Sequence, residues 1–278
     1  MPANNVGAIL YLQALTPLHP GSGTALGAVD LPVQRERHTN WPVIPGSSVK
    51  GVLREATPKD LRPRLFGAGD NEGTSAGALS FTDARTLAFP VRSLKGVFAW
   101  VTCPQVIQRW KRDSGLVGAQ ITLPEINDPG ESGAFFEEGS PCAHNGNKLI
   151  LEEFVFDAKF AVLDFFDALE SEERKRLVVL DDTNFTHFAT YATEVTARIK
   201  LKEETKTVEE HALFYQEFLP AETLLYSLVL ASPSRRRDQP ATAEQNLGAF
   251  RPPETVQIGG DETTGKGLCA IRLVKGGD

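Results

Sequence analysis

The sequence predicts an α+β fold built on an antiparallel sheet. Strand-like and helix-like segments are mixed along the 278 residues, without the regular alternation typical of a doubly wound parallel sheet. The clearest buried strand is ETLLYSLVLAS at 222–232, and the chain closes as a strand, a glycine-rich loop and a strand over 255–274. These observations favour an antiparallel sheet with helices packed against it.

The composition is typical of a globular protein without a membrane segment. No apolar run approaches the roughly 18 residues of a spanning helix, and the first residues lack the basic region and cleavage site of a secretory signal. Cys103, Cys142 and Cys269 are too few and too scattered for a disulfide framework, and Cys142 with His144 has no second ligand pair at zinc-site spacing. We therefore expect a cytoplasmic protein with reduced thiols, no structural zinc and no membrane partner.

A formal net charge of -7 argues against a protein that holds nucleic acid through its overall charge. The positive groups nevertheless gather at 35–38, 50–64 and 235–237, apart from the acidic segments. Any contact with RNA is therefore expected to be local.

The first predicted strand is GAILYLQAL at 7–15, which Thr16 and Pro17 end. The loop that follows, from His19 to about Gly46, is longer than a compact domain usually contains unless the loop is functional. We expect this loop, residues 19–46, to carry function.

A short helix is predicted to begin at Gly46, Ser47 and Ser48, whose small and hydroxyl side chains suit an N-cap, and to end at Thr57-Pro58. Its first-turn N–H groups are expected to attract an anion, and Lys50 and Arg54 lie one turn apart on one face. A phosphate backbone would fit this surface. The alternative is an ordinary capped surface helix with solvated basic residues.

The middle of the chain predicts several further elements. Residues 78–85 resemble a short strand, and from Val97 to Trp110 the pattern is a strand followed by a helix that Thr102-Cys103-Pro104 opens. Residues 112–147 have little periodicity and are predicted to be a mobile insertion. Residues 149–160 resemble a strand. Short helices are expected within 165–189, with Asp182 or Thr183 as a cap.

The segments 192–201 and 211–220 are β-rich and flank a polar turn. This layout predicts either two long arms that project from the body or two core strands.

The glycine-rich loop near the C-terminus has the GxxxxGK spacing from Gly260 to Lys266, but Gly267 replaces the Ser or Thr of a nucleotide-binding loop. Such a loop should open a helix, whereas LCAIRLV resembles a strand. The four glycines instead allow a ligand to approach the backbone closely, with Lys266 adding charge. Phosphodiester binding is therefore predicted, with a plain hairpin turn as the alternative. The predicted contacts are Gly259, Gly260, Gly265, Lys266 and Gly267.

Three features together resemble one family: TPLHPGSG after the first strand, DLPVQRERHTNWPVIPGSSVKGVLRE, and the terminal IGGDETTGKG. The chain looks like the repeated backbone subunit of type III-B CRISPR effector complexes, in the RAMP superfamily. The resemblance implies a single domain over 1–278 with a ferredoxin-like or RRM-like palm, a helical insertion and a β-hairpin thumb near 195–218. It also implies partners: a guide CRISPR RNA, a target RNA, head-to-tail copies of the chain and other subunits.

The same resemblance assigns roles to residues. The helix with Ser47, Ser48, Lys50 and Arg54 and the glycine loop would grip guide phosphates. Asp30 matches the aspartate whose loop cleaves the target RNA, and it would bind Mg²⁺ or Mn²⁺ or take the proton from the ribose 2′-hydroxyl. His19 would assist. In the thumb, Tyr215 and Phe218 are candidate stacking residues, and Glu217 is a further candidate acid.

Several alternatives stay open at this point. A binding-only backbone subunit would have the same fold without cleavage, although Asp30 argues against it. A stand-alone RAMP ribonuclease that processes the guide precursor would share the fold and the glycine loop. The type III-A counterpart would share the chemistry. The interpretation as a small-molecule kinase is rejected, because a predicted strand and not a helix follows the glycine loop.

Overall fold

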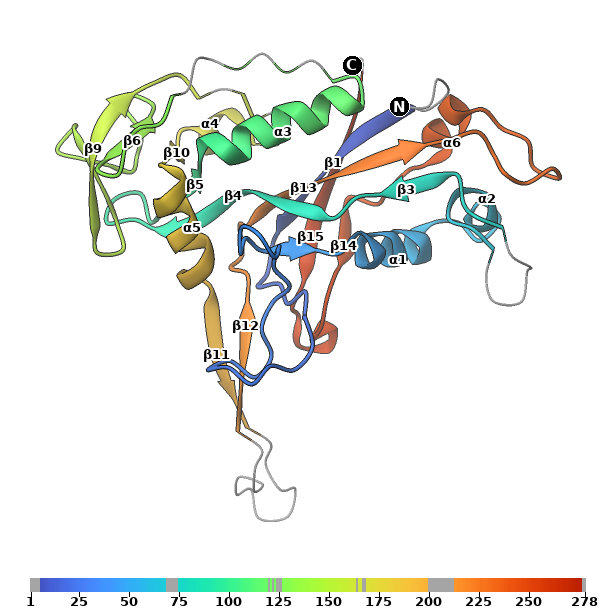
Figure 1. The fold of residues 1–278 in the computed structure, drawn as a ribbon, viewed down its shortest axis with the longest axis horizontal. Coiled ribbons are helices and arrows are strands. Elements are labelled where there is room, and N and C mark those ends of the chain that lie inside the picture. The colour runs from blue at the N-terminus through green and yellow to red at the C-terminus, as the bar shows by residue number, and fades with distance from the viewer. Residues whose placement is uncertain are drawn as a thin grey trace.

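The centre of the protein is an antiparallel sheet with the ferredoxin-like strand order. Residues 6–68, 75–119, 121, 123, 127–163, 165–166, 169–199 and 213–276 are described by the computed structural model. The core elements are, in chain order, β1 (Val6–Ala14), α1 (Gly46–Ala56), β4 (Ala84–Arg92), β13 (Leu224–Ala231), α6 (Ala243–Ala249) and β15 (Leu268–Lys275). The four strands lie in the order β15-β1-β13-β4, with every neighbouring pair antiparallel (Figure 1). The predicted fold class is confirmed.

β1 lies inside the sheet because its apolar sequence is paired on both edges. It pairs with β13 from Val6 opposite Ala231 to Gln13 opposite Leu224, and with β15 on the other side. Residues 7–12 are all buried, as expected for a strand covered on both faces. The predicted strand at 7–15 is thus confirmed within one residue.

Beyond β4 the sheet continues through strands that are inserted between β4 and β13. In spatial order these are β5 (Phe98–Thr102), β10 (Leu177–Val179), β6 (Gly133–Phe136), β9 (Phe154–Phe160), β8 (Lys148–Leu151) and β7 (Ala143–His144). The pairs β5–β10 and β6–β9 are parallel, whereas the others are antiparallel. Short strands extend the sheet at β2 (Val43–Ile44), β3 (Leu79–Phe81) and β14 (Thr255–Gln257).

The structure corrects the prediction that 112–147 lacks regular structure. α3 (Pro104–Leu116) extends into this stretch, and β6 and β7 follow within it. Ala134, Phe136 and Cys142 are fully buried, so the segment contributes to the core. The few apolar residues of this segment are separated by turns, so they show no strand or helix periodicity in the sequence. The mobility of the segment stays a prediction.

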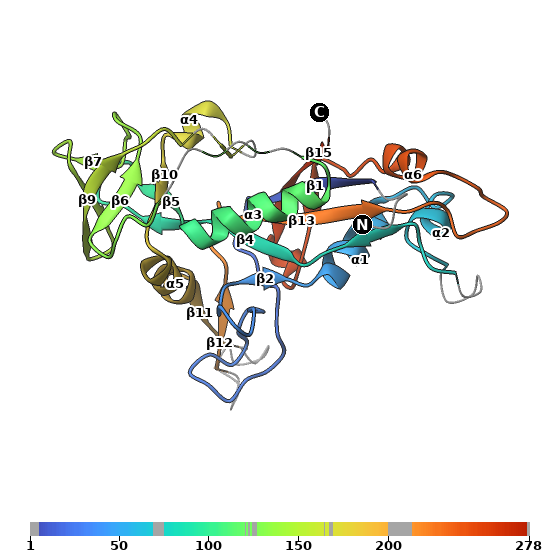
Figure 2. The same ribbon diagram turned by 45° about the horizontal axis from the view of Figure 1, so that its top comes forward.

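α3 begins where the sequence predicted, with Cys103 as N-cap and Pro104 in the first turn. Its buried face carries Val106, Ile107 and Trp110, and the helix lies across β4 and β13 (Figure 2). Two further short helices are α2 (Arg62–Leu65) and α4 (Ser171–Arg174). No helix of the described ranges is long and apolar enough to cross a membrane.

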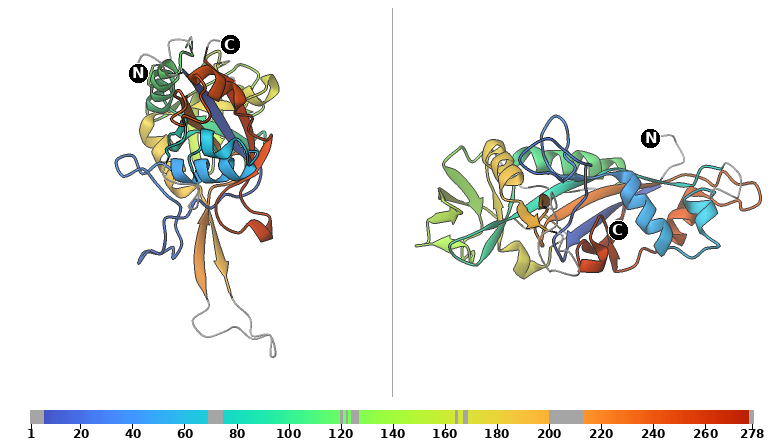
Figure 3. Two further views of the ribbon diagram at one scale, coloured as in Figure 1. Left: turned by 90° about the vertical axis from the view of Figure 1, so that its right-hand side faces the viewer. Right: turned by 90° about the horizontal axis from the view of Figure 1, so that it is seen from below.

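The predicted thumb is a separate two-stranded hairpin of β11 (Glu194–Arg198) and β12 (Phe214–Phe218). The hairpin projects away from the sheet (Figures 1 and 3). The predicted projecting arms are therefore confirmed. The alternative, two core strands, is wrong for β11, whose residues are largely exposed. The base of β12 is buried from Gln216 to Phe218. The predicted polar turn at 202–210 lies outside the described residues.

α5 (Asp182–Tyr191) is capped by Asp181, not by the predicted Asp182 or Thr183. The Asp181 carboxylate accepts hydrogen bonds from the N–H groups of Thr183 and Asn184, at 2.9 and 3.2 Å. The sequence DDT offers three consecutive capping residues, and the buried strand β10 just before them decides which one takes the extended N-cap conformation.

We expect Asp181→Ala to lower the free energy of unfolding by about 1 kcal/mol, because two first-turn N–H groups lose their acceptor. Thr183→Ala should change it by less than about 0.5 kcal/mol, since its exposed hydroxyl makes no described contact. Urea unfolding of the two variants measures the difference. Equal effects would show that Asp181 is not the cap.

Candidate functional site

Three segments that are distant in sequence meet at the base of the hairpin: loop 19–46, β12, and the glycine loop 259–267. Leu18 and Leu31 form bridges to Leu219 and Gln216. The N–H of Gly260 donates to the carbonyl of His19 at 3.2 Å. Figure 3 shows loop 19–46 and the glycine loop on the two sides of the hairpin.

Asp30 is held against the hairpin by main-chain contacts. One of its carboxylate oxygens accepts the Tyr215 N–H at 2.7 Å, and the next residue, Leu31, donates its N–H to the Tyr215 carbonyl at 3.0 Å. The second carboxylate oxygen has no partner within the described residues. The side chain is half-buried. Asp30 therefore presents one unpaired oxygen from a position that the thumb fixes.

His19 is buried, with 8% of its surface exposed, and its Nδ1 lies 2.7 Å from the carbonyl oxygen of Glu217. A carbonyl can only accept, so Nδ1 carries the proton and Nε2 is the acceptor of the neutral ring. The ring also packs against Phe218 at 5.6 Å between centroids. His19 thus combines a packing role with an oriented basic nitrogen.

Glu217 is a structural residue rather than a free acid. Its carboxylate accepts from the Val33 N–H at 2.9 Å, from Arg35 at 2.5 Å and from the Thr193 hydroxyl at 2.8 Å. Only 6% of the residue is exposed. Arg35 also donates to the Ala189 carbonyl at the C-terminal end of α5. Glu217 therefore fastens loop 19–46 to the base of the thumb.

The glycine loop leads into β15, a strand, so its context is that of a hairpin and not of a nucleotide-binding loop. Gly259, Gly265 and Gly267 all have positive φ, at 83°, 76° and 76°. A side chain at Gly259 would collide with the His19 carbonyl, and one at Gly267 would collide with the Ile258 carbonyl. These glycines are required by the fold of the loop itself.

Two cationic side chains pack over the ring of Phe218. Lys266 Nζ lies 5.2 Å from the ring centroid and the Arg198 guanidinium 5.5 Å from it. Arg198 also pairs with Asp261 at 2.8 Å, which ties the glycine loop to the hairpin. Phe218 is 1% exposed and cannot stack on a base, whereas Tyr215 is 41% exposed and can.

Four of the predicted site residues line one cavity of about 350 Å³. They are His19, Ser48, Gly259 and Gly260. Leu31, next to Asp30, forms part of the wall. Gly265 has open space beside it. The predicted catalytic loop, phosphate helix and glycine loop are therefore brought together by the fold.

The predicted hydroxyl cap of α1 is wrong. The N-cap is Pro45, and the first N–H, that of Gly46, donates to Asp83 Oδ1 at 2.7 Å. Ser47 and Ser48 are exposed in the first turn. Arg54 donates to the Gly67 carbonyl at 2.8 Å, while Lys50 is half-buried without a partner among the described residues. Ser47, Ser48 and Lys50 thus stay available to a ligand, and Arg54 is partly committed to the fold.

Gly259→Ala is expected to lower the free energy of unfolding by at least about 1–2 kcal/mol, because it combines a positive φ with a collision at the His19 carbonyl. Gly260→Ala is the matched neighbour, since its new Cβ would meet only the His19 ring at 3.5 Å and its φ is not positive. It should change stability by less than about 0.5 kcal/mol. Thermal and urea unfolding of both variants measures this, and an unaffected Gly259→Ala would contradict the described loop geometry.

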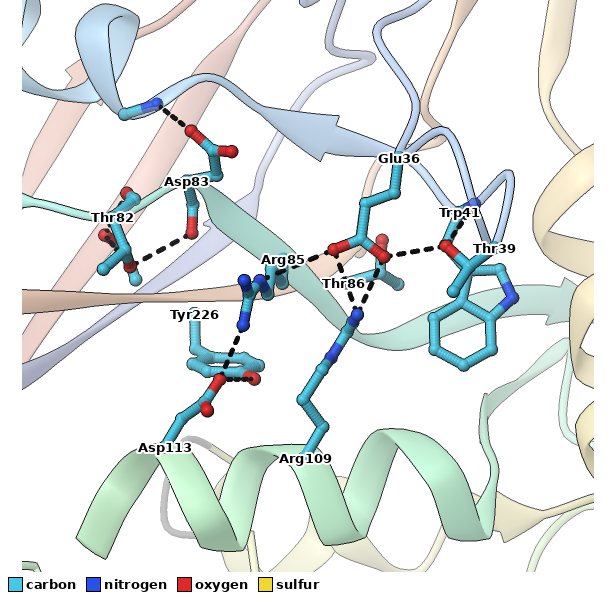
Figure 4. A network of polar contacts seen from close by, with 12 residues as sticks. Glu36, Thr39, Trp41, Thr82, Asp83, Arg85, Thr86, Arg109, Asp113 and Tyr226 are labelled. Carbon is cyan, nitrogen blue, oxygen red and sulfur yellow. Dashed lines mark hydrogen bonds and ion pairs between the residues drawn. The ribbon is translucent and has the colours of Figure 1, made fainter. Parts of the chain in front are cut away.

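A second polar network anchors the far end of loop 19–46, and the sequence reasoning missed it (Figure 4). Glu36 accepts from Thr39 at 2.7 Å and from Arg109 at 2.8 Å, and it lies 3.4 Å from Arg85. Burial opposes ionisation of Glu36, but hydrogen bonds from Thr39 and Arg109 outweigh it and lower its pKa. Arg85 in turn pairs with Asp113, which also accepts from the Tyr226 hydroxyl. In the sequence, only the alternating charges of QRER at 34–37 indicate that such a network forms.

Fold and site together define an RNA-binding type of α+β protein: a ferredoxin-like core with a projecting hairpin and a glycine loop beside a small cavity. The RAMP superfamily matches residues 11–270. The chain is 39% identical over 283 residues to "CRISPR system Cmr endoribonuclease Cmr4" of Pyrococcus furiosus, with 95% of each chain covered. It belongs to the RAMP superfamily.

Solved structures agree with this assignment. Oligomeric Cmr4 from Pyrococcus furiosus superposes with a TM-score of 0.75 and 32% identity, covering 97% of this chain and 98% of that one. A chain of the type III-B Cmr-beta complex bound to cognate target RNA gives a TM-score of 0.78 at 23% identity, covering 98% of both chains, and shows the shared fold. The palm and thumb expected from the sequence are therefore confirmed.

Proposed function

We propose that this protein is the repeated guide-RNA-binding backbone subunit of a type III-B CRISPR effector complex and that it cleaves complementary target RNA at regular intervals. The observation that carries the proposal is that loop 19–46, which carries both Asp30 and His19, lies against the thumb hairpin, with His19 also lining the cavity beside the glycine loop. This arrangement occurs in a chain that resembles a Cmr endoribonuclease over 95% of its length. The partners are a guide RNA, a target RNA, head-to-tail copies of the chain and the other subunits.

The division of labour follows from the chemistry of the groups. Ser47, Ser48, Lys50 and the glycine loop hold guide phosphates through N–H groups, hydroxyls and charge. An acidic protein then holds RNA because many copies contribute local positive sites along one strand. Base pairing with the guide chooses the target. The projecting hairpin interrupts the duplex and exposes a nucleotide to attack.

Asp30 is the proposed catalytic residue. In-line cleavage of RNA requires removal of the 2′-hydroxyl proton, and the unpaired carboxylate oxygen of Asp30 can accept it. His19, whose Nε2 is the acceptor of the neutral ring, assists as a base or as a phosphate contact when protonated. The thumb holds Asp30 through the Tyr215 N–H, which couples the position of the carboxylate to the kink in the RNA.

We further propose that cleavage depends on Mg²⁺ or Mn²⁺. If the unpaired oxygen of Asp30 holds the ion, His19 Nε2 takes the 2′-hydroxyl proton in its place. No group of three or more His, Cys, Asp or Glu side chains is placed to hold a metal among the described residues. The donor set fits only an ion that takes one protein carboxylate and completes its shell with RNA phosphates and water, a common arrangement for Mg²⁺. Such an ion would stabilise negative charge at the scissile phosphate.

Reconstituted complex and a labelled RNA complementary to the guide test the proposal. The expected result is a ladder of cuts at constant spacing that requires Mg²⁺ or Mn²⁺ and disappears with EDTA. Cutting that persists in EDTA would reject the metal while leaving the subunit assignment intact. Tight target binding without any cuts would instead identify a binding-only backbone subunit.

A further inference from the structure

A second cavity, of about 420 Å³, lies away from the cavity at the thumb. It is formed between α3, the start of β4 and the part of loop 19–46 that the Glu36 network anchors (Figure 4). Its lining is entirely polar or charged: Glu36, His38, Arg85, Gln105, Gln108, Arg109 and Arg112. None of the expected site residues belongs to it.

One face of α3 supplies four of these residues. Gln105, Gln108, Arg109 and Arg112 are spaced i, i+3, i+4 and i+7, so they form one stripe along the helix. The buried stripe of the same helix carries Val106, Ile107 and Trp110. Gln105, Gln108 and Arg112 are exposed and need not be polar donors for the sake of the fold. The stripe therefore concentrates hydrogen-bond donors at the cavity, and two of them, Arg109 and Arg112, are also tied to Glu36 and Asp113 by ion pairs.

The local charge is positive in an otherwise acidic protein. Arg85, Arg109 and Arg112 contribute three guanidinium groups, against the carboxylates of Glu36 and Asp113. The network thus carries one net positive charge, whereas the whole chain has a formal net charge of -7. His38 adds a further donor at the rim when it is protonated.

Arg109 shows that this network is incomplete. Its side chain is only 10% exposed, and its Nη1 donates to both oxygens of Glu36 at 3.0 and 2.8 Å. Nε and Nη2 are buried and have no hydrogen-bond partner among the described residues. The guanidinium packs over the Trp41 ring at 5.0 Å. Buried charged donors are normally hydrogen-bonded, and the Trp41 ring offers no hydrogen-bond acceptor of that strength, so Arg109 retains the capacity to bind an anion.

We propose that this cavity binds a phosphate group, supplied by the backbone of the bound RNA strand. A phosphate matches the site because several guanidinium donors converge there and each can present paired N–H groups to its oxygens. Slight movement of the Arg109 side chain toward the cavity lets its unpaired nitrogens join Arg112 and the glutamine amides around the ligand. This contact would be additional to those of α1 and the glycine loop. Only the choice of RNA as the phosphate source depends on the function proposed above.

Binding of single-stranded RNA to the full-length protein, measured by fluorescence anisotropy over a range of salt concentrations, tests the site. Arg112→Gln removes one charge at a side chain that is 67% exposed, and Gln108→Glu adds a negative charge at the rim. Lys111→Gln is the matched control, because it changes the charge by the same amount on the same helix but lies outside the cavity. Urea unfolding verifies that all three variants fold.

We expect Arg112→Gln and Gln108→Glu to weaken RNA binding about tenfold, and Arg112→Gln to reduce the slope of log affinity against log salt by about 0.7. Lys111→Gln should leave both nearly unchanged. In a second arm, titration with inorganic phosphate followed by ³¹P NMR distinguishes the source. Phosphate binding that the two variants abolish, with unchanged RNA affinity, would support the anion site but assign it to a free anion.

The proposal is overturned if the variants behave like Lys111→Gln in both arms. Neither readout involves cleavage and none of the variants touches Asp30. If the protein does not cleave RNA but the variants weaken binding as expected, the proposed cleavage activity is rejected and the phosphate site is retained.

Discussion

Replacing Asp30 with asparagine is expected to reduce target RNA cleavage by about 10²- to 10⁴-fold, the range that removal of a general acid or base produces. Asparagine keeps an oxygen that can accept the Tyr215 N–H at this position, so the loop and the thumb should stay in contact. The variant loses only the negative charge and the basicity of the second oxygen. Single-turnover cleavage by the reconstituted complex measures the rate, and gel-shift titration measures target binding.

Asp157→Asn is the control for the change in charge. Asp157 is exposed on β9, at the far end of the sheet, where it pairs with Lys148. Complex that carries Asp157→Asn should cleave target RNA at the wild-type rate. An unchanged rate in Asp30→Asn would place the chemistry on another residue or subunit. If target binding also fell strongly in Asp30→Asn, the residue would be required for assembly and its catalytic role would be unsupported.

The largest loss of stability is expected for Glu217→Ala, at about 3–5 kcal/mol in the free energy of unfolding. The change leaves the buried Arg35 guanidinium without its counter-charge, although its bonds to main-chain carbonyls remain, and it removes the acceptor of the Val33 N–H and of the Thr193 hydroxyl. Residues 33–35 of loop 19–46 would lose their side-chain anchor to the hairpin, so cleavage would fall as well. Urea unfolding of the purified chain measures the first effect and complex activity the second.

A double-mutant cycle isolates the ion pair. Arg35→Ala and Glu217→Ala together should destabilise the protein by about 0.5–3 kcal/mol less than the sum of the single changes, because neither charge is then left unpaired. Glu194→Ala, at an exposed site on β11, is the control and should fall within about 0.5 kcal/mol of wild type. Additive single effects would mean that Arg35 and Glu217 do not interact.

Local patterns predicted the elements that depend mainly on neighbours in the chain. The apolar runs located β1 and β13, and Cys103-Pro104 fixed the start of α3 because a proline suits the first turn of a helix. The β-rich pieces on each side of a polar turn predicted two strands but left open whether they project or join the core, and the family resemblance favoured a projecting hairpin. The family resemblance supplied the expected ferredoxin-like strand order and the role proposed for Asp30, neither of which any local pattern contains.

Helix caps were predicted only in part by local patterns. The helices at 46 and 182 were located, but their first N–H groups find acceptors that local preference did not select. Asp83 caps α1 from 37 residues away, and Asp181 is chosen over two equally suitable neighbours. Residue type shows that a cap is needed, whereas packing decides which oxygen reaches the N–H.

By itself, then, the sequence determined the mixed α+β fold, the thumb hairpin and the identity of the candidate catalytic loop. It also showed that the acidic and the basic residues gather in different segments. Only the tertiary structure showed that Glu217 is a clamp, that Phe218 is buried while Tyr215 is exposed, and that Arg109 lacks acceptors. The reason is physical: helix and strand preferences act over a few residues, but these roles depend on partners up to 198 positions apart, as in the bond from His19 to Glu217. Such partners become neighbours only after the sheet has formed.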